Sequence, residues 1–286
     1  MNALVLHDGA HLAYQVEGPR DAPALTFVNS LGTDMRLWEP QVHWLRKYYR
    51  VLRYDIRGHG MSSLGDGPIT IEQLGRDLSS LLGHLEIERT HICGLSLGGM
   101  VALWLAACHP ERIDRAIFAN TSAQIGTPVV WQSRIAAVRG GGMAAIREQV
   151  VARFLGEEFR ARRPDVSETI GEMLLRQSAA GYIAACTVLQ ETDLDPNIPS
   201  IRAPSLIIAG TRDEATPPYQ AAELQAAIAG SRAAMLDAAH LSNVEQPDAF
   251  TDHMIRFLGT AEQTGSASAL NSERDSLKGS HIGTGH

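Results

Sequence analysis

The hydrophobic and polar positions of the chain follow two alternating periods. Short apolar runs predict eight strands, which cover residues 4–7, 11–16, 24–29, 49–55, 90–93, 113–120, 203–210 and 231–238. Between these runs, apolar residues spaced three and four apart predict helices at 39–47, 70–84, 100–109, 217–228 and 247–258. Strands and helices that alternate in this way are typical of an α/β protein with a mostly parallel sheet and helices on both of its faces.

Two local patterns define boundaries within this scheme. Thr70 and Gln73 stand three residues apart before an apolar stripe, as in a capping box, and predict that a helix begins at Thr70. The dipeptide Asp8-Gly9 lies between the first two predicted strands and predicts a two-residue hairpin turn.

The alternation stops between residues 124 and 192. Helical periodicity continues there in four alanine-rich stretches without a strand pattern between them, at 129–138, 143–155, 167–178 and 180–190. We therefore expect a core formed by 1–123 and 193–259, with a helical cap inserted at 124–192. Beyond Gly259 the composition shifts to Ser, Gly, Thr and Asn, which predicts a disordered tail over 260–286.

Composition narrows the classes of function. The 286 residues carry a formal net charge of −7 without a basic stripe, which disfavours nucleic acid as a partner. Three widely spaced cysteines predict neither a disulfide framework nor a zinc site. The chain has no signal-peptide pattern and no apolar run as long as a membrane helix, so we expect a cytoplasmic protein. No pattern in the sequence indicates an oligomeric state.

One pentapeptide points to a specific chemistry. Gly94-Leu95-Ser96-Leu97-Gly98 has the form G-x-S-x-G, and it lies between the strand at 90–93 and the helix at 100–109. In this context the serine occupies a sharp turn, where two glycines remove side chains that would collide with the strand and the helix. The pattern predicts that Ser96 is a nucleophile held above the sheet, at the N-terminus of a helix.

A serine nucleophile needs a general base, and the base needs an acidic residue that orients it. After such a turn the usual chain order is serine, acid, histidine. Asp213 follows the strand at 203–210 and His240 follows the last predicted strand, so both occur at strand ends in that order. Glu214 is the alternative to Asp213, and His59 is a less favoured alternative to His240.

Acyl transfer also requires two N–H donors for the oxyanion. Leu97, the residue after the nucleophile, is expected to supply one backbone N–H, and Leu31, in the loop after the strand at 24–29, the other. Asp55, Arg57 and His59 are expected to organise the loop that follows the strand at 49–55.

Several segments resemble the α/β-hydrolase superfamily and, within it, the 3-oxoadipate enol-lactonases. The segments similar to the superfamily as a whole are NSLGTDMRLWEPQV (29–42), YDIRGHGMSS (54–63) and HICGLSLGGMVALWLA (91–106). Those similar to the lactonase branch are GYIAACTVLQETDL (181–194), IIAGTRDEATPP (207–218) and DAAHLSNVEQPDAF (237–250). The resemblance extends from about residue 10 to residue 258 and implies an α/β-hydrolase fold.

The resemblance implies hydrolysis of 3-oxoadipate enol-lactone to 3-oxoadipate in the β-ketoadipate pathway of aromatic-compound breakdown, without a metal or an organic cofactor. Its partner would be a small anionic lactone, so a cation is expected in the cap. Trp131 and Arg134 stand three apart on a predicted helix and share a face. Arg134 would pair with the substrate carboxylate and Trp131 would form an apolar wall. A solvated Arg134 is an equally open interpretation, because the cap contains several other arginines.

Two other functions stay open. A broad-specificity carboxylesterase or a cofactor-free perhydrolase would use the same triad with a different pocket. A receptor-like protein with a vestigial hydrolase site would share the fold and turn substrate over slowly. The serine at position 96 disfavours haloalkane dehalogenases and epoxide hydrolases, which use aspartate there.

Overall fold

Eight strands form one sheet in the computed structural model, which describes residues 2–259. They are β1 (Asn2–Val5), β2 (His11–Glu17), β3 (Ala24–Val28), β4 (Arg50–Tyr54), β5 (Thr90–Leu95), β6 (Ile113–Ala119), β7 (Ser205–Gly210) and β8 (Arg232–Leu236). Their order across the sheet is β1-β2-β4-β3-β5-β6-β7-β8. The pairs β1–β2 and β2–β4 are antiparallel and every later pair is parallel, which confirms the predicted mostly parallel sheet.

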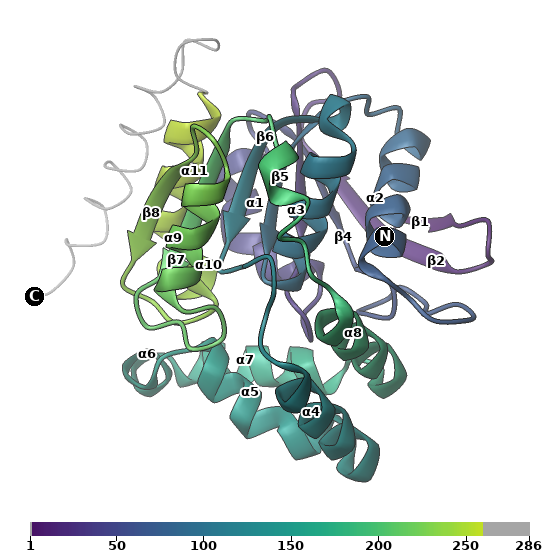
Figure 1. Cartoon of the computed structure of the whole chain (residues 1–286), viewed down its shortest axis with the longest axis vertical. Helices are drawn as coiled ribbons and strands as arrows, with labels where there is room; N and C mark the ends of the chain where they lie inside the picture. Colours follow the sequence, from purple (N-terminus) through teal and green to yellow (C-terminus); the bar gives the residue numbers. More distant parts are fainter. Residues whose placement is uncertain (1, 260–286) are drawn as a thin grey trace, which may run out of the picture.

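Helices cover the sheet on both sides (Figure 1). The longer ones outside the segment between β6 and β7 are α1 (Glu39–Leu45), α2 (Ile71–His84), α3 (Leu97–Cys108), α9 (Pro218–Ala227) and α11 (Pro247–Leu258). Shorter ones are η1 (Met35–Trp38), η2 (Pro110–Arg112) and α10 (Ser242–Glu245), and the short helix η4 (Ile198–Ser200) lies just before β7. Helices α2 and α3 pack against each other, whereas α1 packs against α10 and α11. Among the described residues, no helix combines the length and the apolarity needed to span a membrane.

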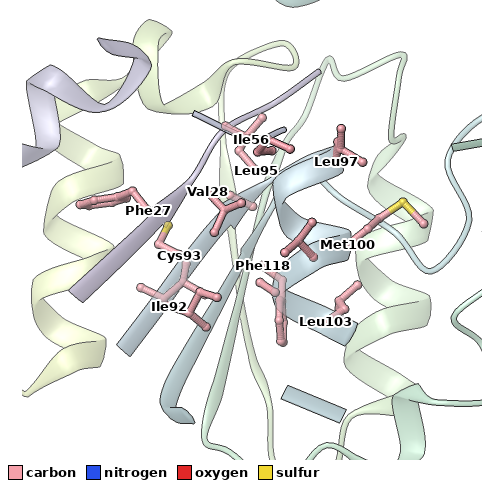
Figure 2. Packing of buried hydrophobic residues seen from close by; sticks show 14 of the residues in the cluster. Phe27, Val28, Ile56, Ile92, Cys93, Leu95, Leu97, Met100, Leu103 and Phe118 are labelled. Atoms are coloured by element: carbon pink, nitrogen blue, oxygen red, sulfur yellow. The ribbon is translucent and has the colours of Figure 1, made fainter. Parts of the chain in front are cut away.

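The central strands are buried on both faces, as their continuous apolar runs predict. Phe27 and Val28 are neighbours on β3, and Figure 2 shows their side chains on opposite sides of the strands. Phe27 stacks on Trp38 with ring centroids 4.6 Å apart, while Val28 lies on the side of Met100 and Leu103, which belong to α3. The sheet therefore has one apolar layer toward η1 and another toward α3.

Five helices between β6 and β7 lie together beyond one end of the sheet (Figure 1). They are α4 (Pro128–Gly141), α5 (Arg147–Phe154), α6 (Glu157–Arg162), α7 (Pro164–Leu175) and α8 (Ala179–Glu191), and we call them the cap. The predicted helix at 143–155 is divided into η3 (Met143–Ile146) and α5, and α6 was not predicted. Helix α7 begins at Pro164 rather than at 167, because proline fits the first turn of a helix.

The cap meets the core at a contact between two backbones. A Cβ atom built on Gly181 of α8 would lie 1.9 Å from the carbonyl oxygen of Gly58, in the loop after β4. Gly58 has a φ of +76°, in the left-handed region that glycine adopts without strain. Only residues without side chains allow α8 to approach the core this closely.

Two sequence predictions about boundaries have different outcomes. Thr70 caps α2, because its hydroxyl accepts a hydrogen bond from the Gln73 N–H at 3.3 Å, as predicted. The prediction of a two-residue turn at Asp8-Gly9 was wrong. The Leu6 N–H donates to the Ala10 carbonyl at 2.7 Å, and Gly9 has a φ of +82°, so the turn takes one residue more and β1 ends earlier. The predicted disordered tail at 260–286 lies outside the described residues.

Buried charges organise the loop after β4. The Arg57 guanidinium donates to both carboxylate oxygens of Asp77 at 2.7 and 2.9 Å and to Asp8 at 2.8 Å. Asp55 accepts backbone N–H groups from Met35 at 2.7 Å and Met61 at 2.8 Å. Burial raises the pKa of Asp55 to about 6 although these two N–H donors lower it. The loop is thus fixed by charge-assisted hydrogen bonds, as expected from the sequence.

Substitutions at two glycines of α2 test the close contact between α2 and α3. A Cβ atom on Gly75 would lie 2.0 Å from Trp104 of α3, whereas one on Gly83 meets nothing within 4 Å. We expect Gly75→Ala to lower the free energy of unfolding by about 1–3 kcal/mol through overpacking. Gly83→Ala, the matched control, should raise it by up to about 1 kcal/mol. Urea unfolding measures both, and equal effects of the two substitutions would contradict the close contact.

The raised pKa of Asp55 predicts a pH dependence of stability. Its folded-state pKa is about 6 instead of 3.8, so its contribution to stability is complete below about pH 4 and is lost as the pH rises through 6. Asp55→Asn removes this titration. Between about pH 5 and pH 7 the stability of the wild type should fall by about 1 kcal/mol relative to the variant. A stability difference that stays constant across this range, measured by urea unfolding, would contradict the prediction.

Candidate active site

Three residues of the predicted site, Ser96, Asp213 and His240, follow the ends of strands β5, β7 and β8. Ser96 stands between β5 and α3 with a φ of 58° and a ψ of −119°, a backbone conformation that non-glycine residues rarely adopt. A Cβ atom on Gly94 would lie 2.1 Å from the Gly98 carbonyl oxygen, and one on Gly98 would lie 2.2 Å from that of Val28. Both glycines are therefore required for the sharp turn that holds Ser96 above the sheet.

His240 and Asp213 are in direct contact. His240 Nδ1 lies 2.8 Å from Asp213 Oδ2, and both side chains are buried. Asp213 Oδ2 also accepts hydrogen bonds from Asn120 Nδ2 at 2.9 Å and from the Thr216 hydroxyl at 2.7 Å. Burial raises the pKa of Asp213, but the charge of His240 and these hydrogen bonds lower it by a larger amount. The net result is a pKa of about 2. Asp213 is thus an ionised carboxylate that fixes the orientation of the imidazole ring.

The alternatives considered for the acid and the base lie elsewhere. Glu214 is exposed and has no contact with His240, while its neighbour Asp213 points inward. His59 is buried beside the carbonyl of Arg57, at 3.3 Å, and burial lowers its pKa to about 4. The geometry therefore favours Asp213 and His240 over both alternatives.

Ser96 and His240 line one pocket between the core and the cap. Leu31 lines it too, and the Leu97 N–H is the first of α3, where backbone donors have no acceptor within the helix. Much of the wall is apolar, formed by Leu31, Ile125, Val130, Trp131, Phe154 and Leu189. Ser96 and His240 thus share a largely apolar space, which strengthens electrostatic interactions.

Both of the predicted cap residues reach this pocket. Trp131 donates from Nε1 to the Ile125 carbonyl at 2.6 Å, which fixes its ring as part of the wall. Arg134 is buried, and its Nη1 donates to the Tyr182 hydroxyl at 3.1 Å. The interpretation of Arg134 as a solvated residue was therefore wrong.

A second arginine of the cap, Arg153, also lines the pocket and was missed in the sequence. Its Nη2 donates to the Glu214 carbonyl at 3.1 Å, and its Nε is buried without a hydrogen-bond partner. Within residues 2–259, neither Arg134 nor Arg153 forms an ion pair with a carboxylate. The pattern of α5 does not distinguish Arg153 from the other arginines of the cap, so only the tertiary structure identifies it.

The cap also contacts the loop that carries His240. The Phe154 ring stacks on the His240 ring with centroids 5.7 Å apart, and the Leu241 N–H donates to the Phe154 carbonyl at 2.9 Å. The buried Glu245 carboxylate accepts hydrogen bonds from Gly156 N–H at 2.9 Å and Ala239 N–H at 3.0 Å. The end of α5 therefore helps to hold His240 in place.

Comparisons with known proteins show which family the chain resembles. A family model described as the alpha/beta hydrolase family matches residues 27–253. The 3-oxoadipate enol-lactonase 2 of Acinetobacter baylyi is 41% identical over 239 residues, which are 84% of this chain and 90% of that protein. An enol-lactonase from Burkholderia xenovorans LB400 is 43% identical with a TM-score of 0.88, over 90% of this chain and 99% of that one.

A more distant solved structure is that of an esterase. A thermophilic esterase from Thermogutta terrifontis is 27% identical with a TM-score of 0.83, over 90% of this chain and 98% of that one. Lactones are cyclic esters, so the relatives named here all act on ester bonds. With its fold, its serine turn and these matches, the chain belongs to the α/β hydrolase family.

Proposed function

We propose that this protein hydrolyses 3-oxoadipate enol-lactone to 3-oxoadipate through an acyl-enzyme on Ser96. The observation that carries the proposal is the pair of guanidinium groups, Arg134 and Arg153, in the pocket that Ser96 and His240 line. Among the described residues no carboxylate forms an ion pair with either arginine. Arg134 is buried and Arg153 is half-buried, and a charge removed from water without a partner is unfavourable. An anionic substrate would supply the missing partner, and the free carboxylate of this lactone is such a group.

The first half of the reaction opens the lactone ring. His240 Nε2 takes the proton of Ser96 Oγ as this oxygen attacks the lactone carbonyl carbon. The backbone N–H groups of Leu31 and Leu97 donate to the oxyanion. The ring C–O bond then breaks, and the leaving enolate oxygen receives the proton from His240. The resulting enol tautomerises to the ketone, still joined to Ser96 as an ester.

The second half releases the product. Water gives a proton to His240 and attacks the ester carbonyl carbon, and the bond to Ser96 Oγ breaks as His240 returns the proton to the serine. Asp213 stays ionised and stabilises the imidazolium in both halves. The new carboxylic acid loses its proton to solvent, so the product carries two carboxylates where the substrate carried one, and two guanidinium groups line the pocket.

Ser96→Ala tests the nucleophile. We expect kcat/KM for the enol-lactone to fall by about 10⁴-fold or more, since the remaining groups cannot form the acyl-enzyme. Ser205→Ala, which removes another buried serine hydroxyl at the start of β7, serves as the matched control and should keep activity near the wild type. Steady-state hydrolysis of the lactone and of p-nitrophenyl acetate measures both variants. Full activity of Ser96→Ala would refute the mechanism, and a wild-type preference for the aryl ester would favour a carboxylesterase instead.

Arg134→Met tests recognition of the substrate carboxylate. Loss of a charged hydrogen-bond donor should lower kcat/KM for the anionic lactone by about ten- to hundredfold. Hydrolysis of neutral p-nitrophenyl acetate should change little, because that ester has no carboxylate to lose its partner. Arg139→Met, on the exposed side of the same helix α4, is the matched control. Equal losses on both substrates would show that Arg134 supports the cap and does not select the anion.

A further inference from the structure

One buried side chain contacts the loops that carry both the acid and the base. Asn120 directly follows β6, and its Nδ2 donates to Asp213 Oδ2 at 2.9 Å and to the Ala239 carbonyl at 3.4 Å. Its Oδ1 accepts a hydrogen bond from the Ser242 hydroxyl at 2.5 Å. Asn120 thus connects the end of β6 to the loop after β7 and to the loop after β8.

The orientation of the Asn120 amide is determined by its partners. The Asp213 carboxylate and the Ala239 carbonyl can only accept hydrogen bonds, so the amide nitrogen must face them. The Ser242 hydroxyl then donates to the amide oxygen on the other side. All three polar partners lie in a region where Asn120 and Ser242 are almost completely buried, so water does not compete for these bonds.

The backbone conformation at position 120 does not by itself explain why the residue is asparagine. Asn120 has a φ of 44°, in the left-handed region that glycine adopts without strain. Its N–H donates to the Ile208 carbonyl at 2.8 Å, which continues the pairing of β6 with β7. Glycine would satisfy this backbone equally well, so what asparagine adds is its side-chain amide.

We propose that Asn120, oriented by Ser242, is a positioning residue that holds Asp213 and His240 in register and reduces the basicity of the Asp213 carboxylate. The inference rests on the proposed triad of Ser96, Asp213 and His240. Asp213 Oδ2 accepts from His240 and from Asn120, so a donor on one side weakens the attraction of this oxygen for the imidazolium on the other. Removal of the Asn120 donor is therefore expected to strengthen the attraction of Asp213 for the imidazolium.

The hydrogen-bond partners of Asp213 make the effect of Asn120 on the His240–Asp213 pair measurable. His240 is the titratable side chain that contacts the carboxylate. The other donors are neutral: Asn120 Nδ2, the Thr216 hydroxyl and the N–H groups of Ala215 and Thr216. A change at Asn120 therefore alters the acid limb of the pH–rate profile through Asp213 and His240.

The experiment is the pH profile of kcat/KM for p-nitrophenyl acetate across about pH 5–9, where an essential base titrates. Asn120→Gly keeps the backbone conformation and removes the donor. We expect about a tenfold loss at the plateau and an acid limb moved to higher pH by about half a unit. Asn120→Asp places a second carboxylate beside Asp213 and should move the limb further in the same direction, by about one unit.

A matched control separates this role from a structural one. Asn243 is an equally buried asparagine whose Nδ2 donates to the Leu37 carbonyl at 3.1 Å, without contact to Asp213. Asn243→Ala should lower thermal stability and leave the acid limb where it is in the wild type. If the Asn120 variants lose activity with an unmoved acid limb, Asn120 has only a structural role and the proposal is overturned.

Two further variants keep the test decisive. If the Asn120 variants do not fold, Ser242→Ala releases the amide from its anchor and should move the limb upward by a smaller amount, and an unmoved limb overturns the proposal. The Ser96→Ala variant reports on the triad separately. An inactive Ser96→Ala together with an unmoved limb refutes only the role of Asn120, whereas an active Ser96→Ala refutes the triad on which it rests.

Discussion

The close approach of three backbone segments around Ser96 is the constraint on which the rest of the site depends. Gly94 and Gly98 come so near to each other and to the end of β3 that neither position has room for a Cβ atom. Ser96 is therefore the N-cap of α3, and the helix begins at Leu97 directly after it, so the positive end of the helix dipole lies beside the serine. The strained backbone of Ser96 is tolerated because the surrounding sheet and helix are tightly packed.

The cap contributes to the chemistry as well as to the pocket. Phe154 stacks on the imidazole of His240, and Glu245 links Gly156 of the cap to the loop after β8. A displacement of α5 would therefore disturb the base together with the entrance. Arg134 and Arg153 belong to the same set of helices, so the guanidinium groups of the pocket and the residues that contact His240 come from one segment of the chain.

The sequence predicted the features that depend on local pattern. The strand–helix alternation, the cap of Thr70 on α2 and the glycines around Ser96 are all determined by residues close together in the chain. Contacts between residues far apart in the chain could not be predicted from the sequence. Nothing near Arg153 distinguishes it from other cap arginines, and Asn120 follows its strand without any motif. The hairpin at Asp8-Gly9 was misjudged because an Asp-Gly pair also fits a three-residue turn, in which the glycine takes the left-handed conformation.

The glycine contact between α8 and the core has a consequence for how the specificity of such an enzyme can evolve. Any side chain at position 181 would push α8 away from Gly58, and with it the adjacent Tyr182, whose hydroxyl holds Arg134. A substitution at either glycine therefore changes the charge lining of the pocket without touching a residue that faces it. Substitutions at wall positions such as Val130 and Leu189 can change the shape of the pocket directly, whereas Gly58 and Gly181 lie outside its lining and have no room for a side chain.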